Sequence, residues 1–285
     1  MLTVVGSVNL DLVARVPRLP AAGETLSATG FARVPGGKGA NQALAAHRLG
    51  ADVRLVAAVG SDPLADEALA LLHTGGVRLD GVRRVREAST GLALIQVDDA
   101  GDTTIVVVPG ANAALAVDDA DVAGAGAVLT VLEVPIAAVA AAAEHAAPAA
   151  FFALNAAPAR PVPQRVLRRV LRRADLVVVN RAEHAALGGG VHAARCVAVT
   201  NGAAGAVLLR DGAEVARAAP PQVHAVDGTA AGDAFTAALV VAMLDGLADQ
   251  DALRRACAAG ALAASRHGAQ PSLPTTAQVD GILAR

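Results

Sequence analysis

The chain has 285 residues, with 24 Lys and Arg against 26 Asp and Glu, and it contains no Trp and no Tyr. Alanine supplies 72 residues and glycine 28, so the mean hydropathy of +0.47 comes largely from small side chains. No stretch free of Asp, Glu, Lys and Arg exceeds 15 residues, whereas a spanning helix needs about 20 apolar residues. A near-neutral charge without a basic stripe also argues against nucleic acid as a partner.

The N-terminus and the cysteines narrow the class of protein further. The first residues contain no basic segment before the acidic Asp11, which argues against a secretory signal peptide. Cys196 and Cys257 are too few for a disulfide framework or a metal cluster. We therefore expect a cytoplasmic α/β protein that binds neither membranes nor nucleic acid.

Short apolar, β-branched runs alternate with alanine-rich helical patterns along the whole chain. The expected strands are 3–8, 53–59, 127–132, 150–154, 176–179 and 197–200, and the expected helices are 39–49, 63–74, 136–146, 163–173, 233–244 and 251–265. Strands separated by helices predict a mainly parallel sheet covered on both faces, which is a three-layer α/β/α fold. No linker or repeat divides the chain, so we expect one domain over residues 1–285.

Two segments depart from this alternation. Residues 12–34 contain short polar and apolar alternations interrupted by prolines, and residues 89–108 contain two strand patterns joined by the turn sequence Asp-Asp-Ala-Gly-Asp. We interpret them as a small antiparallel sheet, a β lid that projects from the main sheet. Apolar residues on both of its faces predict that it pairs with a second copy in a homodimer.

The first expected strand ends in a polar pair. Asn9 and Asp11 share one face of an extended chain, at the carboxyl end of a strand, where open α/β sheets bind ligands. An amide beside a carboxylate suits the hydroxyl groups of a polyol. A turn with an Asx cap explains the pair equally well.

A glycine-rich segment runs directly into the first expected helix. Residues 36–42 read Gly-Gly-Lys-Gly-Ala-Asn-Gln, and such glycines let backbone N–H groups approach a ligand at a helix N-terminus. The segment is not a Walker A loop, because Gly39 stands where Ser or Thr must follow the lysine. No dinucleotide-binding fingerprint follows the first strand either. The alternative is a mobile glycine turn with one solvated lysine.

A third candidate segment opens the helix expected at 233–244. The small residues Ala230, Ala231 and Gly232 leave three consecutive backbone N–H groups free at a helix N-terminus, which favours a bound anion. Asp233 then places a carboxylate beside that anion. A helix cap also explains an aspartate there, but it does not explain why the preceding turn lacks large side chains.

Six motifs occur in one order along the chain. They are G-S-V-N-x-D from Gly6, G-G-K-G-A-N-Q from Gly36, S-T-G from Ser89, P-G-A-N from Pro109, N-x-x-E from Asn180 and A-A-G-D-x-F from Ala230. Together they resemble the ribokinase branch of the PfkB carbohydrate kinase family over residues 3–273, and the Gly-Ala-Gln-Pro-Ser at 268–272 resembles that branch too. Each motif alone is weak, but six in register are specific.

The resemblance implies an enzyme that transfers the γ-phosphoryl group of ATP to a sugar hydroxyl. Asp233 would be the catalytic base, and the N–H groups of Ala230, Ala231 and Gly232 would hold the transferring group. The favoured substrate is D-ribose, phosphorylated at O5. Another furanose, such as deoxyribose or a nucleoside, stays open, and a non-catalytic sugar-binding protein is disfavoured because it needs no base beside an anion site.

The resemblance also assigns binding residues. The sugar positions are Asn9, Asp11, Gly37, Lys38, Asn41 and Glu133, together with Asp233. Asn180 and Glu183 match the motif that organises Mg²⁺ and the phosphates, and Thr200, Gly202, Gly205, Gly232 and Cys257 match nucleotide positions, although Cys257 is also explained as a small buried hydrophobe. A monovalent cation, usually K⁺, would bind between Asp227 and Thr229 on one side and Ala263, Arg266, Gly268 and Ser272 on the other.

Two departures from the family pattern have structural consequences. Gly228 stands where the family usually has Thr, which loosens the loop that would bind the cation. Only 16 residues separate Glu183 from Thr200, where family members commonly fit a whole helix. We expect a short loop there and a weaker affinity for ATP.

Overall fold

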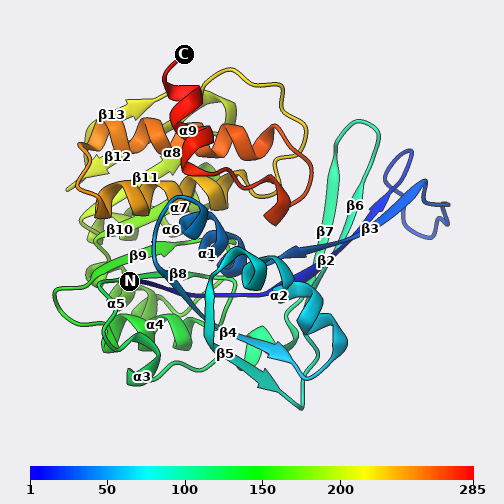
Figure 1. Cartoon of the computed structure of the whole chain (residues 1–285), viewed down its shortest axis with the longest axis horizontal. Helices are drawn as coiled ribbons and strands as arrows, with labels where there is room; N and C mark the ends of the chain where they lie inside the picture. Colours follow the sequence, from blue (N-terminus) through cyan, green and yellow to red (C-terminus); the bar gives the residue numbers. More distant parts are fainter.

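The computed structural model describes all 285 residues and is built around a nine-stranded sheet in the order β13-β12-β11-β10-β9-β8-β1-β4-β5 (Figure 1). Its strands are β1 Leu2–Val5, β4 Val53–Gly60, β5 Arg78–Val85, β8 Ala127–Val131, β9 Phe151–Asn155, β10 Leu176–Asn180, β11 Cys196–Thr200, β12 Ala206–Arg210 and β13 Ala213–Ala218. All neighbouring strands pair in parallel except β11 with β12 and β12 with β13, which pair antiparallel. The expected mainly parallel sheet is confirmed.

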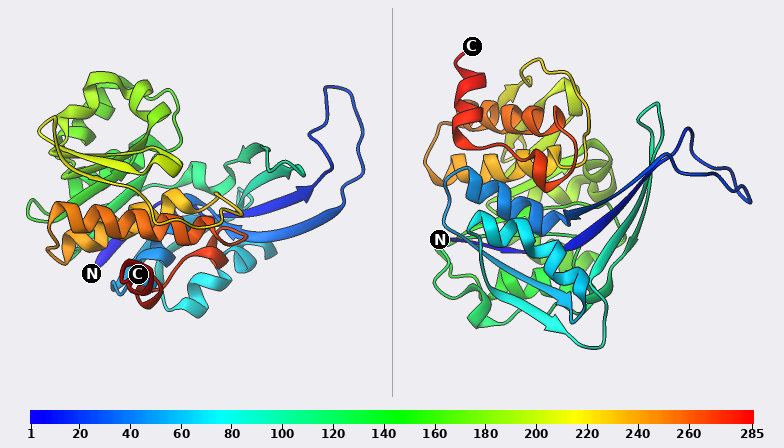
Figure 2. Two further views of the ribbon diagram at one scale, coloured as in Figure 1. Left: turned by 90° about the horizontal axis from the view of Figure 1, so that it is seen from above. Right: turned by 45° about the vertical axis from the view of Figure 1, so that its right-hand side comes forward.

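Helices cover both faces of this sheet (Figure 2). One face carries α1 Lys38–Arg48, α2 Pro63–Gly75, α7 Ala231–Leu244, α8 Asp249–Ala264 and α9 Thr276–Leu283; the other carries α3 Asp119–Val122, α4 Ile136–His145, α5 Gln164–Arg173 and α6 Arg181–Leu187. Four short 3₁₀ helices, η1 Gly110–Ala114, η2 Gly188–Ala193, η3 Gly202–Ala204 and η4 Gln270–Ser272, lie in the connections. None of the helices combines the length and the apolar character needed to cross a lipid bilayer.

The core follows from the apolar runs of the parallel strands. Every residue of β1 and of β8 is buried, because helices cover both faces of the sheet. The larger apolar cluster, of 49 buried residues, lies under α1, α2, α7 and α8, and a second cluster of 27 lies under α4 and α5. The helices are rich in alanine, which lets them pack closely on the sheet.

A second, four-stranded sheet projects from the body (Figures 1 and 2). Its order is β3-β2-β6-β7, with β2 Asn9–Arg15, β3 Gly30–Gly36, β6 Gly91–Val97 and β7 Thr103–Val108. The expected hairpin between β6 and β7 is confirmed, but the expectation of a purely antiparallel sheet is wrong, since β2 and β6 pair in parallel. The reason is that β2 continues from β1 and β6 from β5, two strands of the parallel sheet that end at the same edge.

The shortened segment after Glu183 is not the loop that the sequence suggested. Helix α6 occupies Arg181–Leu187 and η2 follows directly. The helix forms because Asn180 and Glu183 make a capping box, in which each side chain accepts a hydrogen bond from the other residue's backbone N–H. Gly188, with φ of 56°, then ends the helix.

Candidate active site

Asp233 lies in the first turn of α7 and is only 3% exposed. Its Oδ2 accepts a hydrogen bond from Asn41 Nδ2 at 2.9 Å, and its Oδ1 accepts one from Gln42 Nε2 at 2.8 Å. The helix begins after Ala230, and no side chain caps it. The interpretation of Asp233 as a helix cap is therefore wrong, because both of its oxygens face α1.

The turn before Asp233 presents free backbone donors. Ala230 and Gly232 N–H groups have no acceptor within the chain, whereas the Ala231 N–H donates to Gly228 O at 3.2 Å. A side chain at Gly232 would meet no atom within 4 Å, so this turn opens into free space. Of the three predicted donors, the Gly232 N–H is unpaired in the exposed turn that lines the smaller cavity, at the end of a helix whose dipole favours negative charge, whereas Ala230 is 1% exposed and lines neither cavity.

Lys38 is the positive centre of the site. The carboxylates of Asp233, Glu133, Glu183 and Asp11 all raise its pKa, against burial, which lowers it. Burial raises the pKa of Asp233, while Lys38 and the donors Gln42 and Asn41 act in the opposite direction. One ammonium group therefore balances acids that come from four distant parts of the sequence.

Asp11 lies on β2 and is 6% exposed. Burial, Glu133 and Asp233 raise its pKa to about 7, Lys38 lowers it, and no hydrogen bond contributes. The carboxylate fits only because residue 36 is glycine, since a Cβ there would lie 2.3 Å from Asp11 Oδ2. Asp11 is thus a desolvated acceptor without an internal partner.

The side chain of Asn9 is held by a hydrogen bond from Asn112, which lies in η1. Its Oδ1 accepts a hydrogen bond from Asn112 Nδ2 at 2.8 Å, and Asn112 also bonds the backbone N–H and C=O of Val8 at 2.9 and 3.1 Å. Both Asn9 and Asp11 belong to β2, so the interpretation of this pair as a capped turn is wrong.

The glycine-rich segment packs tightly against β1 and β2. Gly37 has φ of 90°, and a Cβ there would lie 2.7 Å from the backbone nitrogen of Asn9. Glu133 Oε2 accepts hydrogen bonds from the Lys38 N–H at 3.0 Å and from the Ser7 hydroxyl. The interpretation as a mobile turn with a solvated lysine is wrong, because these contacts fix the start of α1 and the Lys38 ammonium lies among carboxylates that act on its charge.

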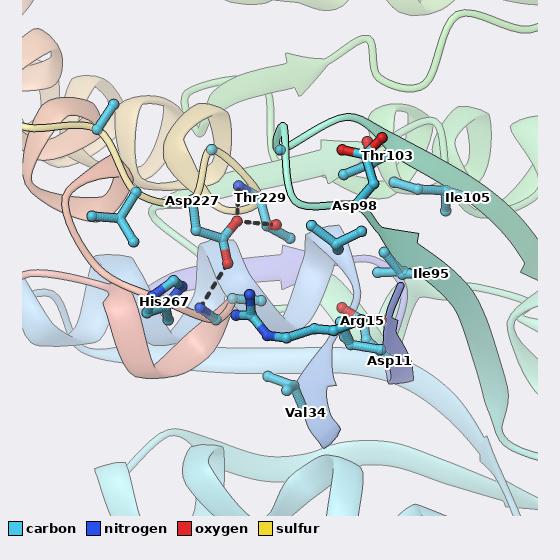
Figure 3. Close-up of a pocket in the computed structure, with 18 of the residues that line it drawn as sticks. Asp11, Arg15, Val34, Ile95, Asp98, Thr103, Ile105, Asp227, Thr229 and His267 are labelled. Carbon is cyan, nitrogen blue, oxygen red and sulfur yellow. Dashed lines mark hydrogen bonds between the residues drawn. The ribbon is translucent and has the colours of Figure 1, made fainter. Parts of the chain in front are cut away.

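Two cavities meet beside this centre. The larger, of about 820 Å³, lies between the projecting sheet and residues 224–229 and 267–269, with Asp11 on one wall and Asp227 on the other (Figure 3). The smaller, of about 650 Å³, is lined by Thr200, Gly202, Gly205, Gly232 and Cys257, which are five of the seven predicted nucleotide residues. Ala225 and Gly228 line both cavities, so the two spaces join just before α7.

Some predicted residues lie outside these cavities. Asn180 and Glu183 cap α6, and Glu183 lines a separate cavity of about 370 Å³ together with Arg160. Burial raises the pKa of Glu183. Among the predicted sugar residues only Asp11 lines the larger cavity; Asn41 and Asp233 are buried, and Lys38 is half-buried.

The two halves of the predicted cation site are joined by Asp227. Its carboxylate accepts hydrogen bonds from the Thr229 N–H at 3.0 Å and the Thr229 hydroxyl, and from the Gly268 N–H at 2.9 Å (Figure 3). Burial raises the pKa of Asp227, but these bonds outweigh it and the net shift is downward. The Ser272 hydroxyl donates to Ala269 O, and the Arg266 side chain points instead to Gln278 Oε1.

Sequence reasoning missed several residues that shape the site. A predicted residue or its neighbour is held through a buried or half-buried hydrogen bond by each of Gln42, Asn155, Asn112 and Ser7. Gln42, Asn112 and Ser7 lie inside the motifs quoted above, and Asn155 follows the strand expected at 150–154. Their positions were therefore visible in the sequence, but their partners were not.

Comparison with known proteins agrees with this geometry. The pfkB family carbohydrate kinase model matches residues 1–276, and the chain belongs to that family. It is 36% identical to the ribokinase of Bacillus subtilis over 98% of both chains, and 34% identical to the ribokinase of Haemophilus influenzae over 96% of this chain and 95% of that one. Its fold matches a solved Arabidopsis thaliana ribokinase complexed with ribose and ATP, with a TM-score of 0.89 and 31% identity over 100% of this chain and 98% of the other. A Thermotoga maritima ribokinase structure also matches with a TM-score of 0.89, at 29% identity over 100% and 99% of the two chains.

Proposed function

We propose that this protein is an ATP-dependent ribokinase, which phosphorylates D-ribose at O5. The observation that carries the proposal is the desolvated, doubly held Asp233 carboxylate beside the junction of two cavities. A base at such a junction suits transfer between two bound molecules. Its relatives named as ribokinases support ribose among the furanoses, and nothing in the site favours a protein that only binds sugar.

The polar groups of the site support a polyhydroxyl ligand. Asn41 Oδ1 is buried without a hydrogen-bond partner, and the Asp11 carboxylate has none within the chain. Buried acceptors without partners are unfavourable, and sugar hydroxyls would satisfy both. No Phe, Tyr or Trp lines the larger cavity, so a small free sugar suits it better than a ligand with a stacking base.

In the proposed reaction, Asp233 takes the proton of the sugar O5 hydroxyl as that oxygen attacks the γ-phosphorus of ATP. The Gly232 N–H binds an oxygen of the transferring group, and Lys38 offsets the negative charge of the surrounding carboxylates. The nucleotide occupies the smaller cavity, whose small residues admit its phosphates close to the backbone.

The residues fit two metal ions. Mg²⁺ typically binds few protein carboxylates and several phosphate and water oxygens, which suits the carboxylate of Glu183, whose charge acts on Lys38, with its capping partner Asn180. The ion would neutralise phosphate charge. K⁺ suits the all-oxygen donors around Asp227, Thr229 and Ser272 and the neighbouring carbonyl groups.

Two further proposals concern the whole molecule. The outer face of the projecting sheet, defined here as Phe31, Leu94, Val106 and Val108, is exposed and apolar, and it would pair with a second copy. Its inner face lines the larger cavity through Asp11, Val13 and Ile95. The outer face would therefore form the dimer interface, while the inner face would contact the ligand. The need for ATP suits a cytoplasmic location.

A coupled assay of ADP release tests the proposed function. The purified protein is given ATP, Mg²⁺ and a panel of pentoses, hexoses and nucleosides, with K⁺ or with tetramethylammonium. We expect the highest kcat/KM with D-ribose and higher activity with K⁺. Preference for a nucleoside or a hexose would contradict the ribose assignment, and equal rates with both cations would contradict the K⁺ site.

A further inference from the structure

A line of buried amide groups lies behind Asp233. Gln42 on α1 is 0% exposed, and its Nε2 donates both to Asp233 Oδ1 at 2.8 Å and to Asn155 Oδ1 at 3.0 Å. Asn155, the last residue of β9, donates from its Nδ2 to Val178 O at 3.3 Å. The line therefore connects a backbone carbonyl of the central sheet to one oxygen of Asp233.

The direction of every hydrogen bond in this line is fixed. The carbonyl of Val178 can only accept, so Asn155 turns its amide nitrogen toward β10 and its oxygen toward Gln42. Gln42 must then present both of its amide hydrogens to oxygen acceptors. Its own Oε1 is left buried without a partner, which is unfavourable for stability and points to a role in the site.

The two oxygens of Asp233 consequently differ. Oδ1 is held by Gln42, which is fully buried and lines neither cavity. Oδ2 is held by Asn41, which also lines neither cavity and is 4% exposed, but which is a proposed sugar residue and has an unpaired Oδ1. A sugar hydroxyl can therefore replace the Asn41 contact at Oδ2, whereas Oδ1 stays bonded to the interior.

We propose that Gln42, supported by Asn155, is a positioning residue that holds Asp233 Oδ1 and leaves Oδ2 as the oxygen that takes the proton. This role rests on the proposed function, in which Asp233 takes the proton of a sugar hydroxyl during transfer of a phosphoryl group from ATP. The sugar O–H bond breaks and its proton moves to Oδ2, the sugar oxygen forms a bond to the γ-phosphorus, and the bond from that phosphorus to the bridging oxygen breaks as ADP leaves with the electron pair.

The first test is the kinetics of Gln42→Leu, which keeps a similar volume but donates no hydrogen bond. We expect kcat to fall by about 10- to 100-fold while KM for ribose changes by less than about threefold. Loss of a donor to the ionised carboxylate raises its pKa, so the acid limb of the kcat profile should move to higher pH. Asn155→Leu should also lower kcat and move the acid limb of the kcat profile to higher pH, each by a smaller amount.

Two controls separate positioning from general damage. Thr130→Val removes another buried side-chain hydrogen bond to β9, from Thr130 to Ala153 O, and should leave kcat within about twofold. In an Asp233→Asn background, Gln42→Leu should cause no further loss of kcat, because the carboxylate it positions is gone. An equal loss in both backgrounds would mean that Gln42 only supports the fold, and the proposal would fail.

A titration that needs no substrate gives an independent answer. The carboxyl ¹³C signal of Asp233, assigned by its absence in Asp233→Asn, is followed against pH in the parent protein, in Gln42→Leu and in Asn155→Leu. A midpoint at higher pH in both variants supports the proposal, and unchanged midpoints overturn it. If the parent phosphorylates no sugar, the proposed function fails while this titration still decides the role of Gln42; if Gln42→Leu does not fold, Asn155→Leu supplies the result.

Discussion

The active-site floor, formed by α1 and α7, and the projecting sheet each contribute one buried carboxylate, but they hold it differently. Asp233 in the floor receives hydrogen bonds from two amides, whereas Asp11 on the projecting sheet has none from the protein. Burial raises the pKa of both groups. This difference suits the roles proposed for them, in which the floor is arranged in advance for proton transfer and the projecting sheet presents an acceptor for a ligand.

The largest expected effect concerns the floor. Asp233→Asn should lower kcat by about 10²- to 10⁴-fold, the usual contribution of a general base, while ribose binding measured by calorimetry persists. Asp245→Asn, at the exposed C-terminal end of the same helix, is the matched control and should leave both kcat and ribose binding unchanged. A turnover close to that of the parent would remove Asp233 as the base.

The next largest effect concerns Asp11. Asp11→Asn should weaken ribose binding by about 10- to 100-fold, because a hydrogen bond to a charged acceptor is lost, while kcat changes much less. Since the pKa of Asp11 is about 7, the ribose affinity of the parent should rise between pH 6 and pH 8 as the carboxylate forms, and that of the variant should change less. Calorimetric titrations at three pH values measure this. Asp99→Asn, in the wall of the same cavity, serves as control. If the ribose affinity of Asp11→Asn depends on pH as strongly as that of the parent, Asp11 is not the group that binds the sugar.

Asp11 should also make the protein less stable at high pH. Its pKa is about 7 in the folded state and near 3.8 when unfolded, so the native state binds more protons across this window and stability falls as pH rises through it. At about 1.4 kcal/mol per pKa unit, the loss is on the order of 4 kcal/mol above pH 7. Urea unfolding at pH 5 and pH 8 should show a smaller decrease for Asp11→Asn than for the parent. Parallel decreases would show that Asp11 does not carry the effect.

The smallest effect on catalysis is expected on the outer face of the projecting sheet. Val106 is 61% exposed there, and Val106→Asp should abolish the proposed dimer in sedimentation velocity experiments while changing kcat by less than about twofold. Val215→Asp, at an exposed position on β13, is the control for adding a charge to an edge strand. Concentration-independent sedimentation of the parent as a monomer would contradict the dimer.

Six strands and six helices of the main body were predictable because each carries its own local pattern, whereas the strands β5, β12 and β13 and the helices α3, α6 and α9 were not among the expected elements. Fully apolar runs such as that of β8 indicate strands buried on both faces, and the glycine-rich turn before α1 indicates a close backbone approach. The parallel pairing of β2 with β6 was not predictable, because it depends on where β1 and β5 end in the assembled sheet. Likewise, the capping box of Asn180 and Glu183 was readable as a motif, but the short helix it starts was not expected in so short a segment.

The sequence by itself determined the family, the fold class and the identities of Asp233, Lys38 and Asp11 as candidate site residues, since these follow from motifs and short-range patterns. Only the tertiary structure decided how they act on one another. Gln42 and Asp233 are 191 residues apart, and their hydrogen bond exists only because α1 packs against α7. Burial and the approach of distant charges set the pKa values of Asp11 and Asp233, and neither effect has a signature in the local sequence.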